Sequence, residues 1–135
     1  MTSTDLDALG IPWCYRADSA RRAATEEPFI INLDDRGGKG THWTAACVKA
    51  DHPPGTMTRR YTLYYADPLG TLLNGYPPAE LEVYKRRIVS RPTFQRPETQ
   101  LCGYYAICFV DAMREMPAGL DQKAFEDRLA YALSY

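Results

Sequence analysis

The sequence has few of the residues that commit a chain to a metal site or a disulfide framework. Only two histidines, His42 and His52, occur among its 135 residues, which excludes multi-histidine metal sites. A mixed site of His, Cys and Asp stays open, but we expect no metal and no other cofactor. The four cysteines are scattered and include no Cys-x-x-Cys pair, so neither a zinc knuckle nor a disulfide framework is indicated. We therefore expect a reducing compartment.

Long apolar runs and an excess of one charge are also missing. The longest apolar stretch, residues 101–110, is interrupted by Gly103 and is too short to span a bilayer. The first residues are polar and acidic, unlike those of a signal peptide. The 16 basic and 17 acidic residues give a net charge of −1, which does not suit a polycationic nucleic-acid binder. We expect an intracellular protein that makes no contact with a membrane.

The length of the chain predicts a single domain, residues 1–135, and no internal repeat or low-complexity tract divides it. Residues 3–10 predict a short helix with a polar N-cap, and the apolar residues 29–33 predict a buried strand. Residues 42–48 and 61–67 are rich in β-formers, with the turn residues 51–55 between them. We expect these two segments to form a hairpin with a long tip.

Three further segments predict helices. Residues 78–87 begin with Pro and acids and end with bases, as the helix dipole favours. Residues 102–113 are apolar almost all round, which is typical of a central helix packed on a sheet. The last helix follows Asp121 as its N-cap and carries Phe125, Leu129 and Leu133 at every fourth position. Together with the strands, these segments predict an α+β fold.

The hairpin and the central helix suggest a site for nucleophilic chemistry. A tip centred on Pro54 and Gly55 would set His42 directly opposite Asp67, with Cβ atoms about 5 Å apart. Cys102 would lie in the first turn of the central helix, where unpaired N–H groups and the helix dipole stabilise a thiolate. The imidazole could then take the thiol proton while the carboxylate orients the ring. Each residue alone also has an ordinary structural interpretation, as a core cysteine, a capped histidine or a turn aspartate.

Three blocks of the sequence resemble the signature blocks of the adenovirus-type cysteine protease (adenain) family, whose relatives include the SUMO-specific proteases. The blocks are Gly40-Thr41-His42-Trp43, Tyr65-Ala66-Asp67-Pro68-Leu69-Gly70 and Gln95-Arg96-Pro97-Glu98-Thr99-Gln100-Leu101-Cys102-Gly103-Tyr104-Tyr105. The spacing Gln-x-Pro-x-x-x-x-Cys-Gly is the most specific part. Residues 29–34 are similar to the segment that leads into the catalytic histidine of viral and transposon members. The resemblance covers roughly residues 28–113.

The resemblance implies a papain-like or adenain-like fold. In this fold a central mixed β-sheet packs against a buried helix that starts at the nucleophilic cysteine, with further helices flanking it. It implies that His42 is the general base, Asp67 its orienting acid and Cys102 the nucleophile. Gln95 would donate its side-chain amide to the oxyanion hole, and the backbone N–H of Cys102 would be a natural second donor.

By this resemblance the protein is a cysteine endopeptidase that cleaves viral precursor or capsid proteins at small, glycine-containing sites during virion maturation. It would act in the host cytoplasm or nucleus, or packaged in the virion. Trp43 and Gly103 are the candidate substrate-binding residues, although a Trp on a hairpin face more often packs in the core. One alternative is a protease or effector that acts on ubiquitin-like conjugates, and another is a non-catalytic binding module with the same fold. The chain departs from the family in its short length and in its long hairpin tip.

A local basic cluster occurs in this otherwise near-neutral chain. Its members are Lys85, Arg86, Arg87, Arg91 and Arg96. Because adenain itself is a DNA-stimulated enzyme, the resemblance allows a weak nucleic-acid contact through this cluster. A solvated face of the predicted helix 78–87 is the ordinary interpretation of the same charges.

Overall fold

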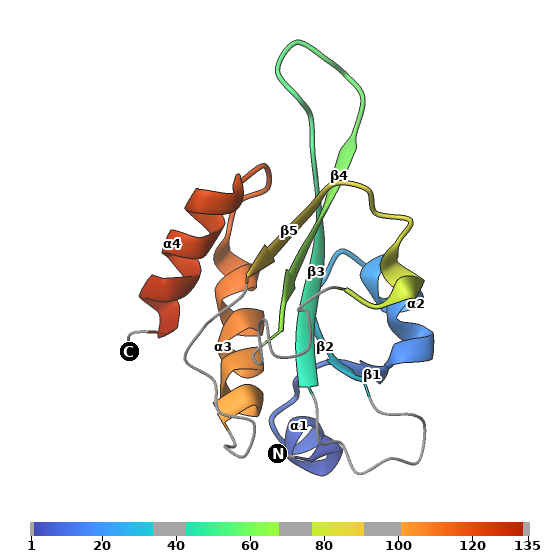
Figure 1. Cartoon of the computed structure of the whole chain (residues 1–135), viewed down its shortest axis with the longest axis vertical. Helices are drawn as coiled ribbons and strands as arrows, with labels where there is room; N and C mark the ends of the chain where they lie inside the picture. Colours follow the sequence, from blue (N-terminus) through green and yellow to red (C-terminus); the bar gives the residue numbers. More distant parts are fainter. Residues whose placement is uncertain (1, 34–42, 68–76, 91–100, 134–135) are drawn as a thin grey trace.

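The computed structural model describes residues 2–33, 43–67, 77–90 and 101–133, with the side chains of 101–104 and 132–133 outside the description (Figure 1). Five strands form one sheet in the order β1-β2-β3-β4-β5. They are β1 (Trp13–Tyr15), β2 (Phe29–Asn32), β3 (Trp43–Asp51), β4 (Arg60–Ala66) and β5 (Arg87–Ser90). The three central strands are antiparallel, and the outer strands β1 and β5 run parallel to their neighbours. The predicted α+β class and mixed sheet are confirmed, while the finer papain-like assignment stays a prediction.

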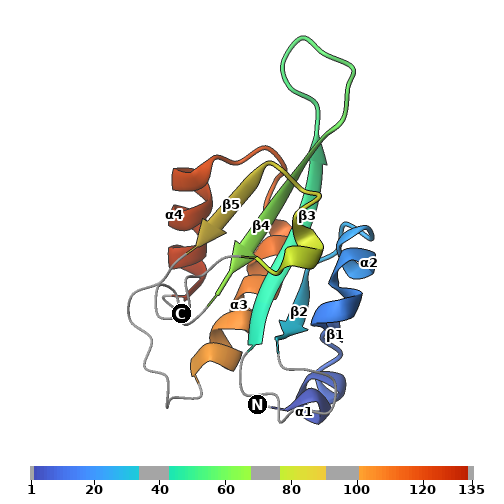
Figure 2. The same ribbon diagram turned by 45° about the vertical axis from the view of Figure 1, so that its right-hand side comes forward.

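Helices pack on both faces of this sheet (Figure 2). On one face lie α3 (Leu101–Glu115) and α4 (Gln122–Leu133), and on the other lie α2 (Ser19–Ala23) and the 3-10 turn η3 (Ala79–Leu81). The strands are therefore buried on both sides, and all four residues of β2 are buried. None of the helices among the described residues has the length and apolar character that a bilayer crossing requires.

Local capping explains where two of the predicted helices begin. The helix α1 (Ser3–Ala8) starts after Thr2, whose hydroxyl accepts from Asp5 N while the Asp5 carboxylate accepts from Thr2 N. The helix α4 starts after Asp121, whose Oδ1 accepts a hydrogen bond from Ala124 N at 2.8 Å. A short 3-10 turn, η1 (Arg16–Asp18), leads into α2. The predicted N-terminal, central and last helices are all confirmed.

The predicted helix over residues 78–87 is wrong. The segment forms only the single turn η3 before it enters β5, which pairs in parallel with β4. The β-branched residues Ile88 and Val89 favour a strand, and Ile88 is buried against the α3 side of the sheet. Arg87 uses its guanidinium locally, because Nε donates to Tyr84 O at 2.7 Å and Nη2 donates to Glu82 O at 3.1 Å. The pairing of β5 with β4 thus outweighs the order of charges that favours a helix in this segment.

The hairpin forms as predicted, but its register differs by two residues. The observed pairs run from Ala45 opposite Ala66 to Asp51 opposite Arg60. Continued by one residue, this register would set Thr44 rather than His42 opposite Asp67. The predicted register is therefore wrong, and the predicted pairing with Asp67 involves His42, which lies outside the described residues.

An ion pair at the tip end of the hairpin accompanies the observed register. Arg60 donates from Nε to Asp51 Oδ1 at 3.1 Å and from Nη2 to Asp51 Oδ2 at 2.7 Å. This two-pronged contact holds the pKa of Asp51 below its ordinary value. The loop between Asp51 and Arg60 is longer than the Pro-Gly pair alone would predict.

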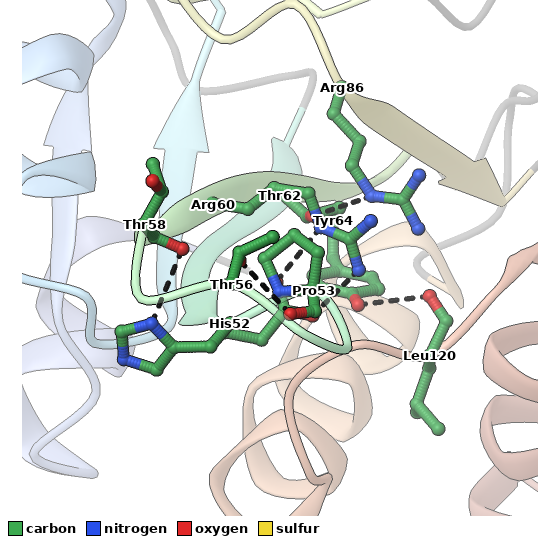
Figure 3. A network of polar contacts seen from close by, with 10 residues as sticks. His52, Pro53, Thr56, Thr58, Arg60, Thr62, Tyr64, Arg86 and Leu120 are labelled. Atoms are coloured by element: carbon green, nitrogen blue, oxygen red, sulfur yellow. Dashed lines mark hydrogen bonds and ion pairs between the residues drawn. The ribbon is translucent and has the colours of Figure 1, made fainter.

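The loop beyond this ion pair is braced by its own hydrogen bonds (Figure 3). Thr56 donates from both N and Oγ1 to Pro53 O, at 3.1 and 3.0 Å. His52 Nδ1 lies 3.3 Å from Thr58 O. Further down the hairpin, Tyr64 donates its hydroxyl to Leu120 O at 3.1 Å, which ties β4 to the connection between α3 and α4.

A substitution at Phe125 would test the packing of α4 on the sheet. Its ring is fully buried, with its centroid 5.3 Å from that of Tyr64 and 6.0 Å from that of Phe109. We expect Phe125→Ala to lower the free energy of unfolding by about 3–5 kcal/mol, measured by urea denaturation. Tyr131→Ala, on the same helix but 67% exposed, is the control and should cost less than about 1 kcal/mol. Equal losses in the two variants would contradict this packing.

Candidate active site

The elements that carry the predicted catalytic residues meet at one end of the sheet. Because β3 and β4 are antiparallel, the start of β3 and the end of β4 are neighbours, and α3 begins at this same end (Figure 1, Figure 2). Asp67 directly follows β4, and Cys102 is the second residue of α3. His42 directly precedes β3 in the sequence and, like Gln95, lies outside the described residues. Gly103 is a backbone position in the first turn of α3.

Asp67 is a buried carboxyl group, only 2% exposed. Its charge acts on the phenol of Tyr65, whose pKa is raised mainly by burial and further by this carboxylate. The Thr44 hydroxyl and the Arg16 guanidinium act in the opposite direction on the same pKa. Arg16 also donates to Glu80 Oε1 at 2.9 Å, which links η1 to η3. Asp67 therefore belongs to a polar group on the α2 side of the sheet end.

Three further buried polar atoms lie at this end of β3 and β4. Within the described parts of the chain, Trp43 Nε1, Thr44 Oγ1 and Tyr65 OH have no partner at hydrogen-bonding distance. The influence of Thr44 on the Tyr65 pKa is therefore that of a nearby dipole, not of a well-formed hydrogen bond. Unpartnered buried groups of this kind cost about 1–3 kcal/mol each. The sheet is thus polar at this end and apolar along most of its length.

Trp43 packs in the core, as the ordinary interpretation of its position predicts. It is 2% exposed and belongs to the cluster beneath α3. Trp13 on β1 meets it edge to face, with ring centroids 6.0 Å apart, and Tyr15 meets Trp13 in the same way at 5.2 Å. Trp13 is only half-buried, and its Nε1 donates to Asp7 Oδ1 at 2.8 Å.

Trp13 is a residue beside the start of β3 that the sequence analysis did not single out. Its ring contacts Trp43 and is the more exposed of the two, so a ligand at this point could contact Trp13 more readily than Trp43. The available signal was that Trp13 and Trp43 are the only tryptophans in the chain. A strand of three residues gave no periodicity that would have placed Trp13 next to its partner.

His52 is separated from the candidate site by the length of β3. It is nine residues beyond Trp43, which corresponds to about 30 Å of extended chain. Its ring is exposed at the hairpin tip and lies against Thr58 O at 3.3 Å. The structure therefore gives His52 no access to Asp67 or to the first turn of α3.

The basic cluster does not form the predicted helix face. Arg87 is bound to backbone carbonyl groups, and Arg86 Nε donates to Thr62 Oγ1 at 2.9 Å. Lys85 is exposed, and Arg91 and Arg96 lie outside the described residues. A nucleic-acid contact through these residues stays a prediction. In the described ranges, no three His, Cys, Asp or Glu side chains are grouped so that they could hold a metal ion.

Two of the other cysteines are poor nucleophiles. Burial raises the pKa of the Cys14 thiol to about 12, and burial likewise raises that of Cys47 to about 11. Both are therefore neutral near physiological pH, because a raised pKa keeps the thiol protonated. Both side chains are buried, which suits a structural role.

We expect iodoacetamide near neutral pH to alkylate Cys102 before Cys14 and Cys47, followed by peptide mass spectrometry over time. The thiolate is the reactive form, and the raised pKa values leave almost none of it at Cys14 and Cys47. Cys14 should become reactive only after unfolding in urea, which serves as the positive control for the label. Labelling of Cys14 in the folded protein with Cys102 inert would reverse this expectation.

Comparison with known proteins adds no relative to this description. No model of a protein family, no curated protein and no solved structure matches the chain. The function is therefore argued from the residues and their placement.

Proposed function

We propose that the protein is a cysteine endopeptidase with Cys102 as nucleophile, His42 as general base and Asp67 as the acid that orients the histidine. The observation that supports this most is the meeting of three chain positions at one end of the sheet. These are the start of β3, the buried Asp67 after β4 and the first turn of α3. The order His, Asp, Cys along the chain matches the three blocks that resemble adenain.

The position of Cys102 suits a thiolate. The helix α3 has 15 residues, and its first N–H groups lack acceptors within the helix. These groups and the helix dipole favour negative charge on a side chain in the first turn. In the proposed reaction His42 takes the thiol proton, and the sulfur forms a bond to the carbonyl carbon of the substrate.

The remaining steps release the two products. The amide C–N bond of the tetrahedral intermediate breaks as His42 returns its proton to the leaving amine. Water activated by His42 then hydrolyses the thioester and regenerates the thiol. Gln95 and the backbone N–H of Cys102 would stabilise the oxyanion in both steps.

The observed register modifies the proposed His42 and Asp67 contact. A shift of two residues keeps both positions on the same face of a hairpin, because side chains alternate with a period of two. Diagonal neighbours on one face are about 7–8 Å apart between Cα atoms, which an imidazole and a carboxylate can bridge. Burial of Asp67 strengthens such a contact, because the surroundings screen the charge less than water does.

The resemblance points to viral precursor polypeptides as substrates, cut at small residues such as glycine inside the infected cell or the virion. The test is incubation with a panel of Gly-Gly-X peptides and ubiquitin-like conjugates, with Cys102→Ala as the control. Cleavage of the peptides alone favours the maturation protease. Cleavage of the conjugates favours the ubiquitin-like-protein protease, and no Cys102-dependent cleavage favours a binding module.

The two histidines provide a matched pair of variants. We expect His42→Ala to reduce kcat by about a thousandfold or more, because the general base is lost. His52→Ala should keep nearly full activity, since His52 lies at the hairpin tip. Initial rates on a cleaved peptide would measure both effects, and full activity in His42→Ala would rule out the proposed base.

Gln95 and Gln100 provide a second matched pair. Loss of one oxyanion donor costs about 3 kcal/mol, or a hundredfold or more in turnover, with little effect on ground-state binding. We expect Gln95→Ala to lower kcat by that amount at nearly constant KM, and Gln100→Ala to change kcat only a fewfold. The opposite order, in variants of unchanged thermal stability, would move the donor role to Gln100.

A further inference from the structure

A cavity of about 590 Å³ opens beside the outer strand β1. The residues Trp13 and Tyr15 of β1 line it, and so do Arg21 and Arg22 of α2. Its volume lies in the range of small-ligand sites. Figure 2 shows β1 and α2 together at the edge of the sheet, away from α3 and α4.

The charge on the wall of this cavity is positive. Arg21 and Arg22 are exposed and make no ion pair with any described residue, whereas Arg16 is paired with Glu80 at 2.9 Å. Among the described lining residues Asp18 is the acid, so two guanidinium groups and one carboxylate give these residues a net charge of +1. Both Arg22 and Asp18 act on the thiol of the lining residue Cys14, and they shift its pKa in opposite directions, Arg22 lowering it and Asp18 raising it.

One aromatic contact connects the lining of the cavity with the first residue of β3. Trp13, which lines the cavity, meets Trp43 with ring centroids 6.0 Å apart. Trp43 directly follows the proposed base His42 in the sequence. On the proposed function, a substrate segment that runs from the site along β1 would reach the cavity.

We propose that this cavity is a subsite for an acidic side chain of the protein substrate. An Asp or Glu would place its carboxylate within reach of Arg21 or Arg22, whose guanidinium groups can each bind a carboxylate through two parallel hydrogen bonds. Its methylene carbons would lie against the rings of Trp13 and Tyr15. This inference rests on the proposed peptidase function, because that function makes the ligand an extended protein segment.

The test measures peptide binding to the Cys102→Ala variant, so that binding is separated from cleavage. Trp13 and Trp43 are the only tryptophans, and one of them lines the cavity, so intrinsic fluorescence reports its occupation. The probes are acetylated peptides with a central Gly-Gly, in which a single Asp moves through the residues before the glycines. At one position the Asp peptide should bind about fivefold or more tighter than its Asn counterpart, and salt should reduce this difference.

Charge reversal identifies the residues responsible. The double variant Arg21→Glu, Arg22→Glu should lose the preference for Asp and bind the matching Lys peptide more tightly. The matched control is Arg114→Glu, Arg128→Glu, which makes the same charge change on the α3 and α4 side of the sheet and should keep the preference for Asp. Thermal melting by circular dichroism would confirm that both variants are folded.

The outcomes separate the subsite from the peptidase. Equal binding of Asp and Asn peptides at every position, or a preference for Asp that survives charge reversal at Arg21 and Arg22, overturns the subsite. Cleavage of these peptides by the wild-type protein without a preference for Asp overturns the subsite and leaves the peptidase standing. Arginine-dependent preference for Asp without cleavage supports the subsite and overturns the peptidase.

Discussion

The pairing of β3 with β4 is the constraint on which the rest of the structure depends. Arg60 closes the tip end of this hairpin through two hydrogen bonds to Asp51. Because side chains alternate between the faces, this register sets Cys47 opposite Tyr64 in the core beneath α3. A slip of one residue would move every side chain of a strand to the opposite face of the sheet. Helices cover both faces, so such a slip would disrupt the packing on each of them. The same register brings β4 to its end just before Asp67, beside the start of β3.

The fold could be predicted from the sequence where a long segment carried its own pattern. The central helix and the last helix were predictable, because Asp121 caps α4 and Phe125 and Leu129 recur on its buried face. The helix expected over residues 78–87 does not form. Acids followed by bases suit a helix dipole, but the base Arg87 instead donates hydrogen bonds to nearby backbone carbonyl groups. The hairpin register differs from the one that a Pro-Gly turn predicts. Its tip is closed by an ion pair between Asp51 and Arg60, nine residues apart in the sequence, and no local turn rule includes such a pair.

The candidate site was predictable as a set of chain positions but not as a geometry. Strand ends and a helix start can be located from local patterns, so Asp67 and Cys102 could be placed at element boundaries. Trp13 could not be, since only the parallel pairing of β1 with β2 brings it to Trp43. The cavity between β1 and α2 was equally inaccessible, because both elements are too short to leave a periodic signal.

The two ends of the hairpin differ in a way that bears on where chemistry can occur. At the tip, polar groups satisfy one another, as Thr56 does with Pro53 and Arg60 with Asp51. At the other end, Asp67 is buried, and the described residues leave Thr44 Oγ1 and Tyr65 OH unpartnered. Such groups lower stability, and proteins tend to keep local conflicts of this kind at functional sites. This contrast is an independent reason to place the proposed chemistry where β4 ends and not at the long tip that departs from the adenain pattern.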